Sequence, residues 1–252
     1  MPTINFTTIP SNVAITDERI NQLNARAIET SAAFTRKLEM MTQAYEEAQA
    51  RFNSEADSLV GSTSGADRNV AKQLVKKRLA QQVLDMRRKL IESSAADRTA
   101  MLNQLKGFAD EAEAISAVCE SPTMMLGRVA LGEPRKGQLI EQLTGAGAIE
   151  VETAARLAVM GNDIVLAAAV LIVVDRKSRD RRPFALGDFA ERMMGPLFKD
   201  VDRKLKSVQL AYRDALAADL EWNRGGPNPT ARISSYLAHR ALTESESTSL
   251  TD

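Results

Sequence analysis

Cysteine and histidine are nearly absent from the chain, which has one residue of each among 252. The lone Cys119 cannot form an internal disulfide, and such cysteine usage is typical of a reducing compartment. The lone His239 excludes sites that need several imidazole ligands, and Tyr236 stands where a helical Glu-x-x-His metal site has its glutamate. A Ser-His-Asp or Cys-His unit would depend on His239, which we interpret as a surface residue. We therefore expect no metal, no cofactor and no catalytic residues, and predict that the protein is not an enzyme.

Aromatic residues, net charge and long apolar runs are scarce too. Aromatics make up 4% of the chain, and residues with high helix propensity such as Ala, Leu, Glu and Lys dominate. Lys and Arg number 33, as do Asp and Glu, so the chain as a whole has no general attraction to nucleic acid or an anionic membrane. The most apolar stretch, Ile164 to Val174, is far shorter than the about 20 residues that span a bilayer. We predict an all-α protein without a transmembrane segment, in which this stretch is a buried helix.

Two long stretches carry the apolar spacing of extended helices. From Asp17 to Leu59, apolar residues recur every three or four positions and neither Pro nor Gly interrupts them. A break of sequence GSTSG follows at Gly61 to Gly65, and a second stretch with the same spacing then runs to Cys119, which we interpret as a small core residue. We predict that residues 16–120 form a long, antiparallel, coiled-coil-like helical hairpin. Within it, the polar segment Glu92 to Asp97 predicts a kink or a new helix, capped by Ser94 and Asp97.

The second half of the chain is richer in Gly and Pro, which predicts shorter helices in a compact domain over residues 121–242. The stretch Ile164 to Val174 is expected at its centre, because a helix that is apolar on all sides must be surrounded. The polar sequence TESESTSLTD, residues 243–252, predicts a flexible tail. The helices expected in this domain are Lys136 to Leu143, Glu150 to Met160, Ile164 to Arg176, Gly187 to Met194, Pro196 to Trp222 and Thr230 to Leu242.

A basic cluster directly follows the apolar stretch, in the sequence RKSRDRR. Guanidinium groups bind phosphates, so the cluster predicts a phosphate or partner contact. Cations at the end of a helix also offset the helix dipole, and Pro183 then ends the helix, an interpretation that we favour. The cluster consists of Arg176, Lys177, Arg179, Arg181 and Arg182.

The opening stretch TINFTTIP holds no charged residue, although 26% of the chain is charged. Its apolar residues lie among Thr and Asn at a spacing that suits an extended segment with one apolar side, and Pro10 keeps a helix from running through it. A lone strand in a helical protein has no partner strand. We therefore hypothesise that residues 1–15 form an extended arm that contacts a neighbouring subunit or protein through Ile4, Phe6 and Ile9. A frayed terminus is the alternative.

The residues FTTIPSNV, Phe6 to Val13, resemble the opening segment of contractile-tail sheath proteins of tailed bacteriophages. The resemblance covers these eight residues and implies a virion structural protein, assembled in the host cytoplasm, whose N-terminal segment contacts a neighbouring subunit. The uncharged start before a helical hairpin is also similar to substrates of bacterial type III secretion, including needle-tip and translocator proteins. The start lacks the basic and apolar regions of a cleaved secretory signal, so we expect none.

The first functional hypothesis is therefore a non-enzymatic structural or assembly protein of a bacteriophage virion. Its expected partners are copies of itself and other structural proteins of the same assembly. The alternatives are an exported helical protein of a type III secretion system and a nucleic-acid-contacting helical module centred on Arg176 to Arg182, with nucleic acid the less favoured partner. A helical enzyme that uses Arg, Lys and Glu is a further alternative, which convergent Arg and Glu side chains in a pocket would favour.

Overall fold

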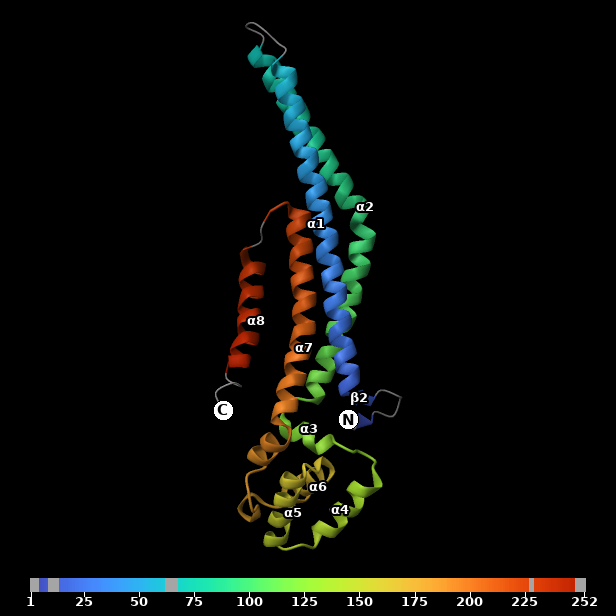
Figure 1. The fold of residues 1–252 in the computed structure, drawn as a ribbon, viewed down its shortest axis with the longest axis vertical. Helices are drawn as coiled ribbons and strands as arrows, with labels where there is room; N and C mark the ends of the chain where they lie inside the picture. Colours follow the sequence, from blue (N-terminus) through green and yellow to red (C-terminus); the bar gives the residue numbers. More distant parts are fainter. Residues whose placement is uncertain (1–4, 9–13, 62–67, 227–228, 248–252) are drawn as a thin grey trace. The chain divides into compact units, whose positions relative to one another are not determined.

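The computed structural model describes residues 5–8, 14–61, 68–226 and 229–247, and confirms the predicted all-α fold (Figure 1). Among these residues, none of the helices combines the length and the apolar character that a bilayer crossing requires. The helices are α1 (Asp17–Gly61), α2 (Arg68–Val118), α3 (Pro122–Arg128), α4 (Pro134–Thr144), α5 (Ala148–Gly161), α6 (Ile164–Asp175), α7 (Leu186–Arg224) and α8 (Pro229–Ser247), with a short 3-10 helix, η1 (Arg179–Arg181).

The N-terminal segment forms a two-stranded antiparallel sheet. Strand β1 (Asn5–Thr8) pairs with β2 (Ala14–Thr16), with Asn5 opposite Thr16 and Thr8 opposite Ala14. The expectation that this segment has no partner strand in its own chain is therefore wrong, because the residues just before α1 supply one. Of the predicted contact residues, Phe6 lies in β1, whereas Ile4 and Ile9 lie outside the described residues. Their contact with a neighbour stays a prediction.

The chain divides into two compact units, and the larger contains residues 1–27, 107–210 and 241–252. Helix α6 lies at the centre of this unit, where α3, α4 and α5 pack against it. The Asp163 side chain accepts a hydrogen bond from the backbone N–H of Leu166 (3.0 Å) and so begins the helix. The predicted burial of this apolar helix is confirmed for most of its length, from Ala167 to Leu171 and at Val173 and Val174.

The second unit contains residues 28–106 and 211–240. Here α1 and α2 lie side by side (Figure 1), and Lys37 of α1 forms an ion pair with Asp97 of α2. The buried residues of α1 in this unit are Phe34, Met41, Ala48 and Ala56, which are seven or eight residues apart, about two steps of the predicted three-and-four spacing. Whether residues 16–120 close into one hairpin stays a prediction, because residues 62–67 lie outside the described part of the chain.

Helix α2 is continuous through Glu92 to Asp97, so the predicted new helix is wrong, whereas the predicted kink stays a prediction. Both residues expected to form the capping box are engaged otherwise. The Ser94 hydroxyl donates to the backbone carbonyl of Leu90 (2.6 Å), and the Asp97 carboxylate pairs with Lys37. A serine that bonds back to the preceding turn is compatible with a helix interior, although such a bond often bends the helix.

The boundaries of α7 and α8 also differ from the prediction. Pro196 lies inside α7, where we expected a break, and the buried side chains of Met194 and Val201 hold the helix on either side of it. Helix α8 ends at Ser247 rather than at Leu242, because no Gly or Pro follows to end it. Whether residues 243–252 form a flexible tail stays a prediction. The units also differ from the predicted domains 16–120 and 121–242, since α1, α2 and α7 each run through both units.

Candidate functional site

The predicted basic cluster ends helix α6. The guanidinium of Arg182 donates to the backbone carbonyls of Lys177 (3.1 Å) and Asp175 (2.9 Å) and pairs with the Asp175 carboxylate (3.0 Å). Arg182 thus satisfies carbonyls at the end of the helix, as the favoured interpretation predicts for it. Arg179 and Arg181 lie exposed in η1.

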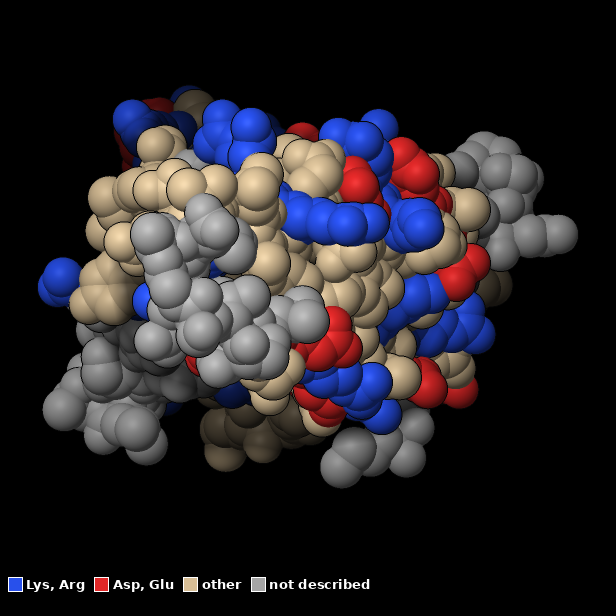
Figure 2. Space-filling model, turned by 90° about the horizontal axis from the view of Figure 1, so that it is seen from above, with Lys and Arg blue, Asp and Glu red and all other residues tan. Residues whose placement is uncertain are grey.

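The other basic residues leave the predicted phosphate or partner contact open. Arg176 caps α6 and is exposed, and Lys177 is half-buried. On the face drawn in Figure 2, Lys and Arg side chains lie among Asp and Glu and are separated by uncharged surface. That face presents no continuous field of one sign, which a nucleic-acid groove would need.

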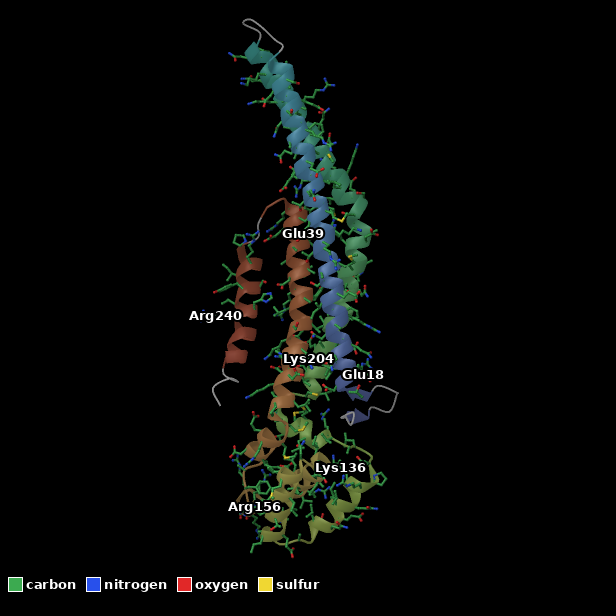
Figure 3. The ribbon with its side chains drawn as sticks, viewed as in Figure 1. Glu18, Glu39, Lys136, Arg156, Lys204 and Arg240 are labelled. Carbon is green, nitrogen blue, oxygen red and sulfur yellow. The ribbon has the colours of Figure 1, made fainter. Side chains whose placement is uncertain are left out.

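A buried lysine that the sequence does not single out lies in α4 (Figure 3). The Lys136 ammonium donates to the backbone carbonyls of Gly127 (2.8 Å) and Val129 (2.5 Å), at the C-terminal end of α3. Burial lowers the pKa of Lys136, whereas the nearby Glu133 carboxylate acts in the opposite direction. No signal in the sequence distinguishes this lysine from exposed ones, because its partners are backbone atoms. Its contacts serve the structure of α3 and α4.

The chain's cysteine and histidine behave as structural residues. Cys119 is buried, and burial raises the pKa of its thiol, which agrees with its interpretation as a core residue. His239 lies exposed on α8, and its Nε2 is 2.7 Å from the Asp214 carboxylate. Within the described ranges, no three His, Cys, Asp or Glu side chains gather closely enough to hold a metal ion.

Helix α8 turns a polar side toward α7. Arg232 pairs with Glu221 (3.0 Å), the Ser235 hydroxyl donates to the Asp214 carboxylate (2.6 Å), and His239 contacts the same carboxylate. The three α8 residues are three and four positions apart, so they lie on one side of the helix. Charged and polar side chains therefore hold α8 on its own chain.

The apolar side of α8 is exposed. Ile233, Tyr236 and Leu237 are 61%, 66% and 57% exposed, and their spacing of three and four places them together on the helix. We call these three residues the α8 apolar face. A surface helix normally buries its apolar side and exposes its polar one. In α8 the polar side makes the contacts with α7 and the apolar face is exposed, which points to a partner that covers the apolar face.

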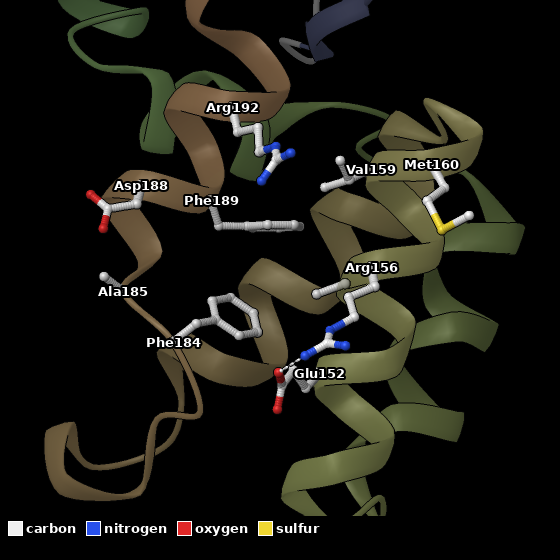
Figure 4. Close-up of a pocket in the computed structure, with 10 residues that line it drawn as sticks. Glu152, Arg156, Val159, Met160, Phe184, Ala185, Asp188, Phe189 and Arg192 are labelled. Carbon is white, nitrogen blue, oxygen red and sulfur yellow. Dashed lines mark hydrogen bonds and ion pairs between the residues drawn. The ribbon is translucent and has the colours of Figure 1, made fainter.

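A groove lies between α5 and the beginning of α7 (Figure 4) and encloses about 420 Å³. On α5 the lining residues are three, four, seven and eight positions after Glu152, so they form one side of the helix. The first turns of α7 and the residues before it supply the opposite wall. The groove is lined by Glu152, Ala155, Arg156, Val159, Met160, Phe184, Ala185, Asp188, Phe189 and Arg192.

Two phenyl rings form the apolar part of this groove. The Phe184 and Phe189 ring centroids are 5.2 Å apart and the rings are inclined by 51°, a tilted arrangement that aromatic pairs favour. Phe189 is anchored in the core, whereas Phe184 is half-buried. Val159 faces the rings from α5 (Figure 4). In a chain with few aromatics, two phenylalanines beside one helix start were the only sequence signal for this groove.

The charged side chains of the groove are not equivalent. Arg156 forms an ion pair with Glu152 on the preceding turn of α5 (2.6 Å). Arg192 is exposed and has no ion pair within the described part of the chain. Figure 4 shows both guanidinium groups directed toward the space between the helices, whereas the Asp188 carboxylate points away from it. The groove therefore combines aromatic rings with positive charge.

The outer side of α5 continues this surface. Ile149, Leu157 and Met160 are exposed, Met160 to 83%, although the opposite side of the same helix is buried against the core through Val151 and Ala158. A helix that is apolar on both sides is expected to be covered on both.

Comparisons with known proteins find no matching family model, no matching curated protein and no matching solved structure.

Proposed function

We propose that the protein is a non-enzymatic structural protein that assembles through exposed helix faces into a homo-oligomer. The observation that carries this proposal is the exposed α8 apolar face, which consists of Ile233, Tyr236 and Leu237. Burying an exposed apolar side chain of this size contributes about 1.5–3 kcal/mol, so three side chains on one helix side can drive association.

The proposed setting is the virion of a tailed bacteriophage, where the neighbours are further copies and other structural proteins. Its support is the resemblance of FTTIPSNV to sheath proteins. Assembly would take place in the host cytoplasm. The N-terminal segment is a second proposed contact, through Ile4, Phe6 and Ile9, and its two-stranded sheet leaves strand edges to which a neighbouring chain can add.

The experiment is a measurement of solution mass by light scattering for the unaltered chain, a chain that begins at Thr16, and the variant Ile233→Ser/Leu237→Ser. We expect a defined multimer for the unaltered chain and fewer subunits for both altered chains. The control is Met40→Ser, because Met40 is also an exposed apolar residue (72%) but lies on α1 rather than on the α8 apolar face. A monomeric unaltered chain would refute the proposal, as would a multimer that Met40→Ser and the α8 variant weaken equally.

A further inference from the structure

We propose that the groove between α5 and α7 binds an acidic amphipathic helix from a different protein. This inference goes beyond self-assembly, because the α8 apolar face and the groove are separate surfaces. The proposed helix inserts an apolar side chain between the phenyl rings and Val159, and a carboxylate beside it pairs with Arg192.

The size of the groove fits such an insertion. Its volume of about 420 Å³ lies within the range of about 300–1,000 Å³ typical of binding pockets. The Phe184 and Phe189 rings and the Val159 side chain offer apolar surface on two sides, so a leucine or phenylalanine side chain can be enclosed there. The groove opens to solvent, which lets the rest of the helix lie outside it.

The length of the apolar surface favours a helix over a small molecule. Ile149 and Met160 lie on the same outer side of α5, and a rise of 1.5 Å per residue places them about 16 Å apart. Leu157 lies between them and continues the exposed surface. An apolar strip of this length matches three turns of a partner helix with anchors three or four residues apart.

The charges of the groove determine the sign of the partner. Arg192 has no ion pair within the described residues and points toward the groove, whereas Arg156 is shared with Glu152. A carboxylate can accept hydrogen bonds from the guanidinium of Arg192 in a bidentate manner. Nucleic acid is less suitable, since its phosphates would meet Glu152 while the phenyl rings and the α5 strip would stay uncovered.

The probe is a helix-forming peptide of about fourteen residues, a length at which helices become stable in water. It carries three leucines spaced four and three residues apart, a glutamate after each leucine, and alanine elsewhere. Two companion peptides replace all glutamates by glutamine or by lysine. Binding to the full chain is measured by fluorescence anisotropy at two salt concentrations.

We expect the glutamate peptide to bind, the glutamine peptide to bind about fivefold more weakly, and the lysine peptide to bind weakest, since a partly exposed ion pair contributes about 1 kcal/mol. The variant Arg192→Gln should bind the glutamate and glutamine peptides equally. Arg179→Gln, which removes an exposed arginine outside the groove, should keep the fivefold difference. Met160→Ser should weaken binding of all three peptides alike, and because Met160 is highly exposed the variant should fold as the unaltered chain does.

Equal binding of the three peptides, or an unchanged preference in Arg192→Gln, would overturn the inference. A multimer that dissociates in Arg192→Gln without any peptide binding would identify a second copy as the occupant and also overturn it. Because the α8 variant Ile233→Ser/Leu237→Ser should bind the glutamate peptide normally, failure of the proposed self-assembly and failure of this inference are distinguishable.

Discussion

The buried ion pair between Arg98 of α2 and Asp219 of α7 offers the sharpest test of how the second unit is held together. Arg98 is 3% exposed, and its guanidinium pairs with the Asp219 carboxylate. The same guanidinium donates to the Ser94 hydroxyl (3.1 Å) and the backbone carbonyl of Ile91 (3.3 Å). The second carboxylate oxygen of Asp219 accepts from the Asn223 amide (2.8 Å). The Arg98 charge is therefore desolvated, the Asp219 side chain is only 14% exposed, and both have further hydrogen-bond partners.

The replacement Asp219→Ala leaves the Arg98 charge buried without its counter-ion. Removing one partner of a buried pair costs about 3–5 kcal/mol, and we expect a value near about 3 kcal/mol, because two other acceptors still contact the guanidinium. Replacing both residues, Arg98→Met/Asp219→Leu, removes both charges and their desolvation cost. The double variant should therefore lose less than half as much stability as Asp219→Ala.

The assay is urea unfolding of the full chain, followed by the helical circular dichroism signal. The control is Asp85→Ala, which breaks the exposed Arg88–Asp85 pair (3.9 Å) and should change the free energy of unfolding by at most about 0.5 kcal/mol. The reasoning fails if Asp219→Ala costs no more than Asp85→Ala, or if the double variant loses as much stability as Asp219→Ala.

Three further predictions concern a glycine, a lysine and an aspartate. Gly225 has φ of +80°, and a Cβ there would lie 2.2 Å from the Arg87 guanidinium, so Gly225→Ala should lower the free energy of unfolding by about 1 kcal/mol or more in urea titrations. Lys136→Met should cost about 2 kcal/mol, because it removes the donor from a buried carbonyl, that of Val129, and from the half-buried carbonyl of Gly127. Burial lowers the pKa of Lys136, so the unfolded chain binds more protons than the folded chain between the lowered pKa and the ordinary 10.5. The contribution of Lys136 to stability therefore rises with pH in this window. Thermal melts at several pH values should show this rise in the unaltered chain and not in Lys136→Met. The hydrogen bond and charge of Lys37 lower the pKa of Asp97. The contribution of Asp97 to the stability of the folded chain is therefore present above the ordinary pKa of 3.8 and is lost as the pH falls through the lowered pKa. An acid titration in which Asp97→Asn unfolds like the unaltered chain would contradict this.

Helical spacing predicts the elements of this fold because it reports which residues a helix buries. The bounds of α6 follow from the apolar stretch and from Asp163, whose capping role is a local interaction. Spacing does not predict α7 as one helix, because Pro196 argues for a break and only the packing of Met194 and Val201 opposes it. Tertiary packing that stabilises a continuous helix therefore overrides the local sequence signal for a break.

The sequence does not predict the candidate sites, and the reason differs from that for α7. The spacing of Ile233, Tyr236 and Leu237 is visible, but it predicts a buried side, and only the partners of Arg232 and Ser235 show that this side faces outward. The groove joins residues of α5 and α7 that are separated along the chain, so no local pattern brings them together. The cluster RKSRDRR, which is conspicuous in the sequence, is in part engaged in ending α6.

The small side chains of α6 set an upper limit on residue size at the centre of its unit. Ala167, Ala168 and Ala169 are fully buried in succession, so every direction around this turn is filled by a neighbouring helix. At Gly127 of α3, an added Cβ would already lie 3.5 Å from the Leu171 side chain. Larger residues here would have to push α3, α4 and α5 apart together. Growth of the side chains at this common axis should therefore be excluded, because several helices would have to move at once to make room for it.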